Sequence, residues 1–189
     1  MLSSNIQAFA ADRGFTLYPG NIGMSSAPYS KYYYYDGAIT GIDYGTRINQ
    51  AFASWSNTPN TYIWMSKTGT KSSSIVDVHA IAIPDISVLG KTTVWNGQTQ
   101  LSFYGGYPWY WAKIEMNTRA NWTSTFVSDN ELFQLACAHE IGHAFGLAHN
   151  TAYYDSLMYP TTFGAEVYHI LGPQTGEING VRALYGTRY

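Results

Sequence analysis

With 189 residues, the chain is long enough for one domain with a substantial hydrophobic core, and only 12% of the residues are charged, against about 25% in a typical protein. The formal net charge of −2 provides no basic field, which argues against a nucleic acid partner. The single cysteine, Cys137, excludes an intrachain disulfide, and no apolar run approaches the ~20 residues of a membrane-spanning helix.

A run of four tyrosines marks the first predicted strand. Residues 30–41 contain these tyrosines followed by Asp-Gly, a turn signal, so we expect a partly buried strand that leads into a loop. A surface platform for carbohydrate is the alternative interpretation of the tyrosines. A helix is predicted within residues 46–59, where Ile48, Ala51, Phe52 and Trp55 recur at helical spacing, and residues 57–60 end it.

Further strands and two more helices complete the predicted elements. The strand-like segments span residues 61–66, 73–83, 91–96 and 112–118, with a Gly-rich aromatic loop at 104–111 before the last one. A helix is predicted from Asp129, a plausible N-cap, to Gly146, which accepts a left-handed conformation. A terminal helix spans 175–186. This order predicts an α+β fold in which helices pack against a sheet.

The segment HEIGHAFGLAH holds three of the five histidines. His139 and His143 are four residues apart on a predicted helix, so both imidazoles can bind one metal ion from the same face. Glu140 can reach a metal-bound water without being a ligand. Gly146 permits a sharp turn that brings His149 back as a third ligand. Three neutral nitrogens leave one position open for water, which is typical of a catalytic zinc site.

Simpler explanations of the cluster are a chance HExxH on a helix and a structural zinc site. The extended pattern fixes five positions, which makes chance unlikely as an explanation, and a structural site would usually recruit a fourth ligand, often cysteine. Cys137 lies two residues before His139 on a different helix face, so we expect it to be a small core residue. His79 is expected to be a strand residue on one sheet face.

The pattern HExxHxxGxxH, followed by Met158 nine residues after the last histidine, resembles the metzincin signature with its Met-turn. Among metzincins, the chain most resembles the matrixins, including their bacterial relatives. INQAFASWS is similar to the first matrixin helix, AKIEMNT to the last strand, LMYP to the Met-turn and EINGVRALYG to the closing helix. Asn150 stands where matrixins usually have serine and Thr162 where many have tyrosine, and the histidines of the family's second zinc site are missing.

The resemblance implies a single metalloprotease catalytic domain over residues 1–189, with an N-terminal subdomain of about 1–148 and a C-terminal subdomain of about 149–189. The implied fold is α+β: a twisted mixed sheet of about five strands with three helices, and a zinc cleft below an antiparallel edge strand. Met158 would form a hydrophobic base beneath the metal site.

The resemblance also implies where a substrate would lie. The substrate would pair antiparallel to an edge strand, for which we expect residues 92–96, with Thr92 and Val94 in the substrate pocket. Tyr159, Pro160 and the residues after them would wall the S1′ pocket beside the zinc and favour an apolar side chain there.

These observations lead to the hypothesis of a zinc-dependent endopeptidase, with one catalytic Zn²⁺ and Glu140 as the general base. Calcium is compatible with the composition but is not indicated, because no acidic loop of recognisable spacing is present. The alternative is a catalytically lapsed metzincin-fold binding module for a surface or cell-wall ligand, which would have no need to keep Glu140.

We expect a protein or peptide substrate, no nucleic acid, no membrane span and a monomer. We also expect a secreted or cell-surface protein whose signal peptide and any propeptide are not present in this chain. The first fifteen residues have neither a basic region nor the apolar core of a signal peptide.

Overall fold

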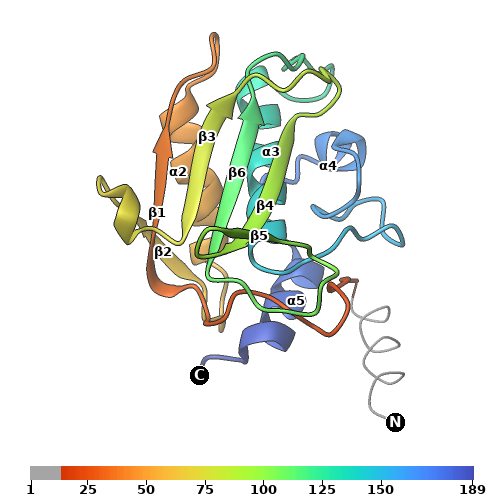
Figure 1. The fold of residues 1–189 in the computed structure, drawn as a ribbon. Coiled ribbons are helices and arrows are strands. Elements are labelled where there is room, and N and C mark those ends of the chain that lie inside the picture. Colours follow the sequence, from red (N-terminus) through yellow and green to blue (C-terminus); the bar gives the residue numbers. More distant parts are fainter. Residues whose placement is uncertain (1–13) are drawn as a thin grey trace.

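In the computed structural model, which describes residues 14–189, a six-stranded sheet is covered on one face by helices (Figure 1). The expectations about the first thirteen residues lie outside the described part. The strands are β1 (Tyr29–Asp36), β2 (Trp64–Lys67), β3 (Val76–Ile81), β4 (Gly90–Asn96), β5 (Thr99–Leu101) and β6 (Trp111–Asn117). The helices are α2 (Tyr44–Ser56), α3 (Asp129–Ala144), α4 (Phe163–Val167) and α5 (Thr175–Tyr185), with a short 3-10 turn, η1 (Lys71–Ser73).

The sheet is mixed, in the order β2-β1-β3-β6-β4-β5. The first four of these strands run parallel to their neighbours, whereas β4 pairs antiparallel with both β6 and β5. The predicted α+β architecture is therefore confirmed, and residues 14–189 contain one more strand and one more helix than expected. Both additions, β5 and α4, are too short to show a hydrophobic period, with three and five residues.

The core lies between the sheet and the pair α2 and α3. Tyr33 of β1 stacks on Phe52 of α2, with ring centroids 3.8 Å apart and an interplanar angle of 5°. Trp55 of α2 donates its indole N–H to the carbonyl of Ala138 on α3 at 3.0 Å. The tyrosine run is thus a partly buried strand, as predicted, because Tyr33 belongs to the core while Tyr32 is exposed.

Helix α3 begins with a capping box one residue earlier than the expected cap. Ser128, not Asp129, is the N-cap: its hydroxyl accepts from the backbone N–H of Glu131, and the Glu131 carboxylate accepts from the backbone N–H of Ser128. At the other end Gly146 has φ +103°, and a Cβ there would lie 2.8 Å from Cα of Gly23. Glycine is therefore required at this helix end, because the backbone has a positive φ and because there is no room for a Cβ.

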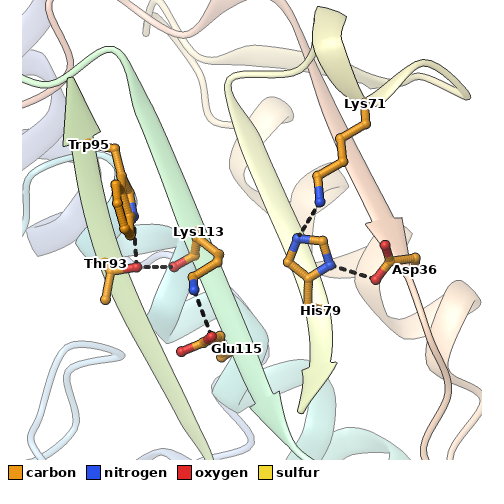
Figure 2. Close-up of polar contacts among 7 residues, drawn as sticks. All are labelled: Asp36, Lys71, His79, Thr93, Trp95, Lys113 and Glu115. Atoms are coloured by element: carbon orange, nitrogen blue, oxygen red, sulfur yellow. Dashed lines mark hydrogen bonds and ion pairs between the residues drawn. The ribbon is translucent and has the colours of Figure 1, made fainter. Parts of the chain in front are cut away.

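The sheet face turned away from α2 and α3 carries polar side chains (Figure 2). His79 of β3 lies with Nδ1 2.5 Å from Oδ1 of Asp36 and Nε2 3.3 Å from Nζ of Lys71. Next to this group, Lys113 and Glu115 of β6 form an ion pair of 2.8 Å. His79 therefore lies on one sheet face with both ring nitrogens engaged.

Candidate active site

Helix α3 holds His139 and His143 on one face, and backbone carbonyls fix both rings. Nδ1 of His139 lies 2.7 Å from the carbonyl oxygen of Leu157, and Nδ1 of His143 lies 2.8 Å from that of Leu147. A carbonyl can only accept, so each Nδ1 must carry the proton. In the neutral form of each ring, Nε2 then has a free lone pair, which is the arrangement that metal-ligating histidines use.

The turn at Gly146 brings His149 back to the helix. After this glycine, Leu147 forms an antiparallel bridge with Leu17, which lies in the segment before β1. The ligand atoms of His139, His143 and His149 all lie within 4.8 Å of one another, and these residues form the only group of three or more potential metal ligands found in residues 14–189. The sequence-predicted triad is therefore brought together.

The three imidazoles fit a divalent metal ion. Nε2 of His143 faces Nε2 of His149 at 3.2 Å, although the proton of His143 is committed to Nδ1. Burial lowers the pKa of His143 well below its usual value, and burial, followed by the proximity of His139, also lowers the pKa of His149. Both rings are therefore neutral near pH 7, the form that binds metal, and a cation is suited to the space towards which their lone pairs point.

Glu140 lies beside this triad with a buried carboxylate. Its Oε2 accepts a hydrogen bond of 2.6 Å from the hydroxyl of Thr92 on β4. Burial raises the pKa of Glu140, while His139 and the hydroxyl of Thr92 act in the opposite direction. Gly90 allows the strand to come this close, because a Cβ at that position would lie 2.8 Å from Cγ of Glu140.

A cleft of about 520 Å³ opens over these four residues. Its lining includes residues 87–92, which lead into and begin β4, and residues 159–162. Tyr18, Phe103 and Tyr104 also line the cleft. The cleft thus has the triad and a buried carboxylate at its base and strand backbone along one side.

The expected pocket residues lie in different places. Tyr159, Pro160 and Thr92 line the cleft. Val94 does not: its side chain is fully buried in the core, so it offers no surface to a ligand. This differs from the expectation, because residues 90, 92 and 94 share one face of β4 but only the first two lie at the cleft.

The expected edge strand is also shorter than 92–96. β5 pairs with Val94–Asn96, and this additional strand covers the outer side of that half of β4. Within the described residues, Gly90 to Thr93 pair on one side only, with β6. The strand backbone available to a ligand is therefore the half nearest Glu140.

Met158 packs against the helical turn that carries the first two histidines. It is buried, and a Cβ added to Gly142 on that turn would collide with its Sδ. The Met158 carbonyl accepts from the backbone N–H of Asn150, and its own N–H lies 3.0 Å from Oγ of Ser156. Ser156 in turn donates to the buried carboxylate of Glu177 on α5 at 2.5 Å. The closing helix therefore anchors the turn below the triad.

One cleft residue, Tyr18, could not be predicted from the sequence. Its hydroxyl lies 3.0 Å from Nδ1 of His143 across 125 positions of sequence, and its ring stacks on Phe103 with centroids 4.3 Å apart. No local pattern marks such a residue, because long-range contacts bring it to the cleft: the bridge between Leu17 and Leu147 and the hydrogen bond from the N–H of Ala148 to the carbonyl of Thr16.

Comparison with known proteins gives one family. A sequence model of the family described as matrixin matches residues 31–186. Interstitial collagenase of Bos taurus is 44% identical over 66 residues, and that of Equus caballus is 42% identical over 65 residues; each match covers 34% of this chain and 13% of the relative. The chain thus matches only a small part of the length of these curated relatives.

One solved structure covers nearly the whole chain. A chain of the structure titled "GM1 bound form of the ECX AB5 holotoxin" superposes with a TM-score of 0.58 at 16% identity, covering 95% of this chain and 94% of that one. At this identity the similarity concerns the fold alone. No helix within residues 14–189 combines the length and the apolar character needed to cross a bilayer.

Proposed function

This chain belongs to the matrixin family, and on that premise we propose that it is a zinc-dependent endopeptidase with Glu140 as its general base. The observation that carries the proposal is the convergence of three imidazoles beside a buried carboxylate in one cleft. His139, His143 and His149 would hold the ion. Zinc bound there would polarise the scissile carbonyl and lower the pKa of a coordinated water towards ~7.

The remaining chemistry belongs to Glu140. Its carboxylate accepts a proton from the attacking water as the new C–O bond forms, and then delivers that proton to the amine as the C–N bond breaks. Burial, which raises the pKa of Glu140, makes it a better proton acceptor than an exposed glutamate. Thr92 orients Oε2 by donating its hydroxyl proton.

The unpaired side of β4 positions the substrate in this proposal. The backbone from Gly90 to Thr93 would pair antiparallel with an extended peptide and lay the scissile bond across the base of the cleft. The S1′ pocket, on the side of the leaving amine, would be lined by Tyr159, Pro160 and the two threonines after them. This lining suits an apolar side chain, with Met158 packed below the histidines as a rigid base.

The wider proposal is one catalytic domain over residues 1–189, divided near residue 148, that acts as a monomer outside the cell or on its surface. The substrate is a protein or peptide. Collagen is not carried over from the two relatives, because the matches cover only 13% of their length. The alternative of a lapsed binding module has no support, because the carboxylate and the three imidazoles are all in place.

A peptide-library digest tests the mechanism. Parent protein should cleave, lose cleavage in 1,10-phenanthroline and regain it when Zn²⁺ is restored. Glu140→Gln keeps the shape of the side chain, so zinc content and melting temperature should stay near the parent's while turnover falls by about 10²–10⁴. Glu115→Gln, which removes a carboxylate from the far sheet face, is the matched control and should cleave normally. Parent-like turnover of Glu140→Gln would disprove the assigned base.

A further inference from the structure

A second depression, of about 510 Å³, lies at the opposite edge of the sheet from the cleft. It is formed where α2 ends and β2 begins. Three strands, β1, β3 and β6, separate β2 from β4 (Figure 1). The two depressions share no lining residue. Whatever this edge binds would therefore leave the catalytic cleft free.

Trp64, at the rim of this depression, is the one exposed tryptophan among the six in the chain, with an exposed fraction of 51%. Its ring is supported by Tyr29, whose centroid lies 6.0 Å away at an interplanar angle of 63°. Tyr29 is held in turn by Tyr62, edge-on at 5.9 Å, and by the guanidinium of Arg188 at 4.7 Å. The indole is therefore a braced, solvent-facing surface, which a ligand can stack on at small entropic cost.

The wall beside the indole is polar and rigid. Thr58 and Thr61 form its floor, with their hydroxyls 2.7 Å apart and both engaged with nearby groups. Asn57 and Asn60 are exposed above this floor, and within the described residues their side-chain amides make no hydrogen bond. Each free amide offers both a donor and an acceptor to a ligand.

The side chains that line the depression indicate which class of ligand it can bind. Among the described residues, no acidic or lysine side chain lines the depression, which argues against a metal ion or a cationic ligand. The one cationic side chain, Arg188, is already packed on Tyr29. A flat apolar surface beside free amides matches a pyranose ring, which has C–H groups on its faces and hydroxyl groups around its rim. Pyranoses with equatorial hydroxyls leave the largest apolar faces.

We propose that this depression, the Trp64 site, binds neutral glycans of β-linked glucose or N-acetylglucosamine units. The other ligand suited to aromatic rims is a proline-rich peptide, which needs aromatic rings set as roughly parallel ridges. Here the rings of Tyr29 and Trp64 cross at 63° and those of Tyr29 and Tyr62 at 87°, so these three rings do not form parallel ridges. The other aromatic residue that lines the depression, Tyr189, is fully exposed. The site would hold the enzyme on a glycan surface while its cleft stays open to protein.

Native gels that contain hydroxyethylcellulose, laminarin or glycol chitin test this proposal. The full chain should be retarded in at least one of the three, and Trp64→Ala should weaken that binding roughly tenfold or more, as the loss of an aromatic anchor does. Tyr168→Ala removes an equally exposed aromatic residue elsewhere and should behave as the parent does. Melting temperatures of both variants verify that they fold. Because Trp64 is half-exposed, we expect Trp64→Ala to change the melting temperature little.

The gels are run in 1,10-phenanthroline, so binding is read without any peptide cleavage. The result is thereby independent of the proposed peptidase activity. Parent protein that migrates unretarded in all three glycans would overturn the proposal, as would equal retardation of parent and Trp64→Ala. Retention on immobilised poly-L-proline that depends on Trp64, without glycan binding, would assign the site to peptide and also overturn it.

Discussion

The hydroxyl of Thr92 lies 2.6 Å from Oε2 of Glu140 and 3.0 Å from the backbone oxygen of the same residue. The strand that forms one wall of the cleft is thereby attached to the carboxylate at its base. A hydrogen bond to a charged group contributes about 1.5–3 kcal/mol. Thr92 therefore holds Glu140, the proposed base, in one orientation. Thr92 belongs to β4, the strand that would also align the substrate.

Thr92→Val should lower kcat roughly tenfold without loss of zinc, because valine keeps the shape of threonine but releases the Glu140 carboxylate. Thr92→Ser, which restores a hydroxyl, should recover much of the rate. Thr93→Val is the matched control: its hydroxyl lies on the far sheet face, where it bonds Trp95, and its loss should leave kcat unchanged (Figure 2). Steady-state kinetics and metal analysis check this, and an unaltered kcat for Thr92→Val would contradict it.

The histidine triad could be predicted from sequence because its ligands lie within eleven residues and the helix and glycine turn fix their directions. Helix α2 was predictable for a similar reason, since its apolar period reflects the side that faces the core. The tyrosine strand was predictable from the β propensity of its tyrosines and the Asp-Gly turn signal after them. The half of β4 covered by β5 could not be predicted. Whether a strand edge is free depends on what pairs with it, and β5 carries no hydrophobic alternation.

Tyr18 and the pairing of Thr92 with Glu140 were beyond sequence reasoning for another reason. Both contacts join residues far apart in the chain, 125 positions in the first case and 48 in the second. Long-range pairs of this kind leave no local spacing, and only the assembled sheet and helices define them. Thr92 was expected at the cleft, but as a substrate contact and not as a partner of the base.

Met158→Ala should lower the free energy of unfolding by roughly 2–5 kcal/mol, because it empties a buried space below the triad. Gly142→Ala should also destabilise, by about 1–3 kcal/mol, since its new methyl group collides with Sδ of Met158. The double variant removes that collision, so its cost should be smaller than the sum of the two single costs. Chemical denaturation of the three variants measures the coupling, and strict additivity would show that the two side chains do not meet.

Ser128→Ala should cost about 1 kcal/mol by removing the N-cap of α3. The hydrogen bonds from Ser128 lower the pKa of Glu131, so this carboxylate stabilises the fold above its ordinary pKa and ceases to do so as pH falls through the lowered value. The difference in the free energy of unfolding between parent and variant should therefore narrow once the pH falls below the ordinary pKa range of a glutamate. Asp43→Ala is the control, because the N-cap side chain of α2 makes no capping hydrogen bond. A difference that persists unchanged at low pH would rule out the capping box as its source.

We expect the protein to bind one zinc ion per chain. The triad is the only group of three or more potential ligands found in residues 14–189. His79 does not supply a second site, because its Nδ1 is 2.5 Å from Asp36 and its Nε2 faces the ammonium group of Lys71, which repels a cation (Figure 2).

Elemental analysis of protein purified without added metal should therefore give about one zinc per chain. His143→Ala should bring the value close to zero, because removing one of three ligands breaks the site, whereas His79→Ala should leave it near one. A reproducible value near two in the parent, reduced to one by His79→Ala, would show that the polar face of the sheet binds metal after all.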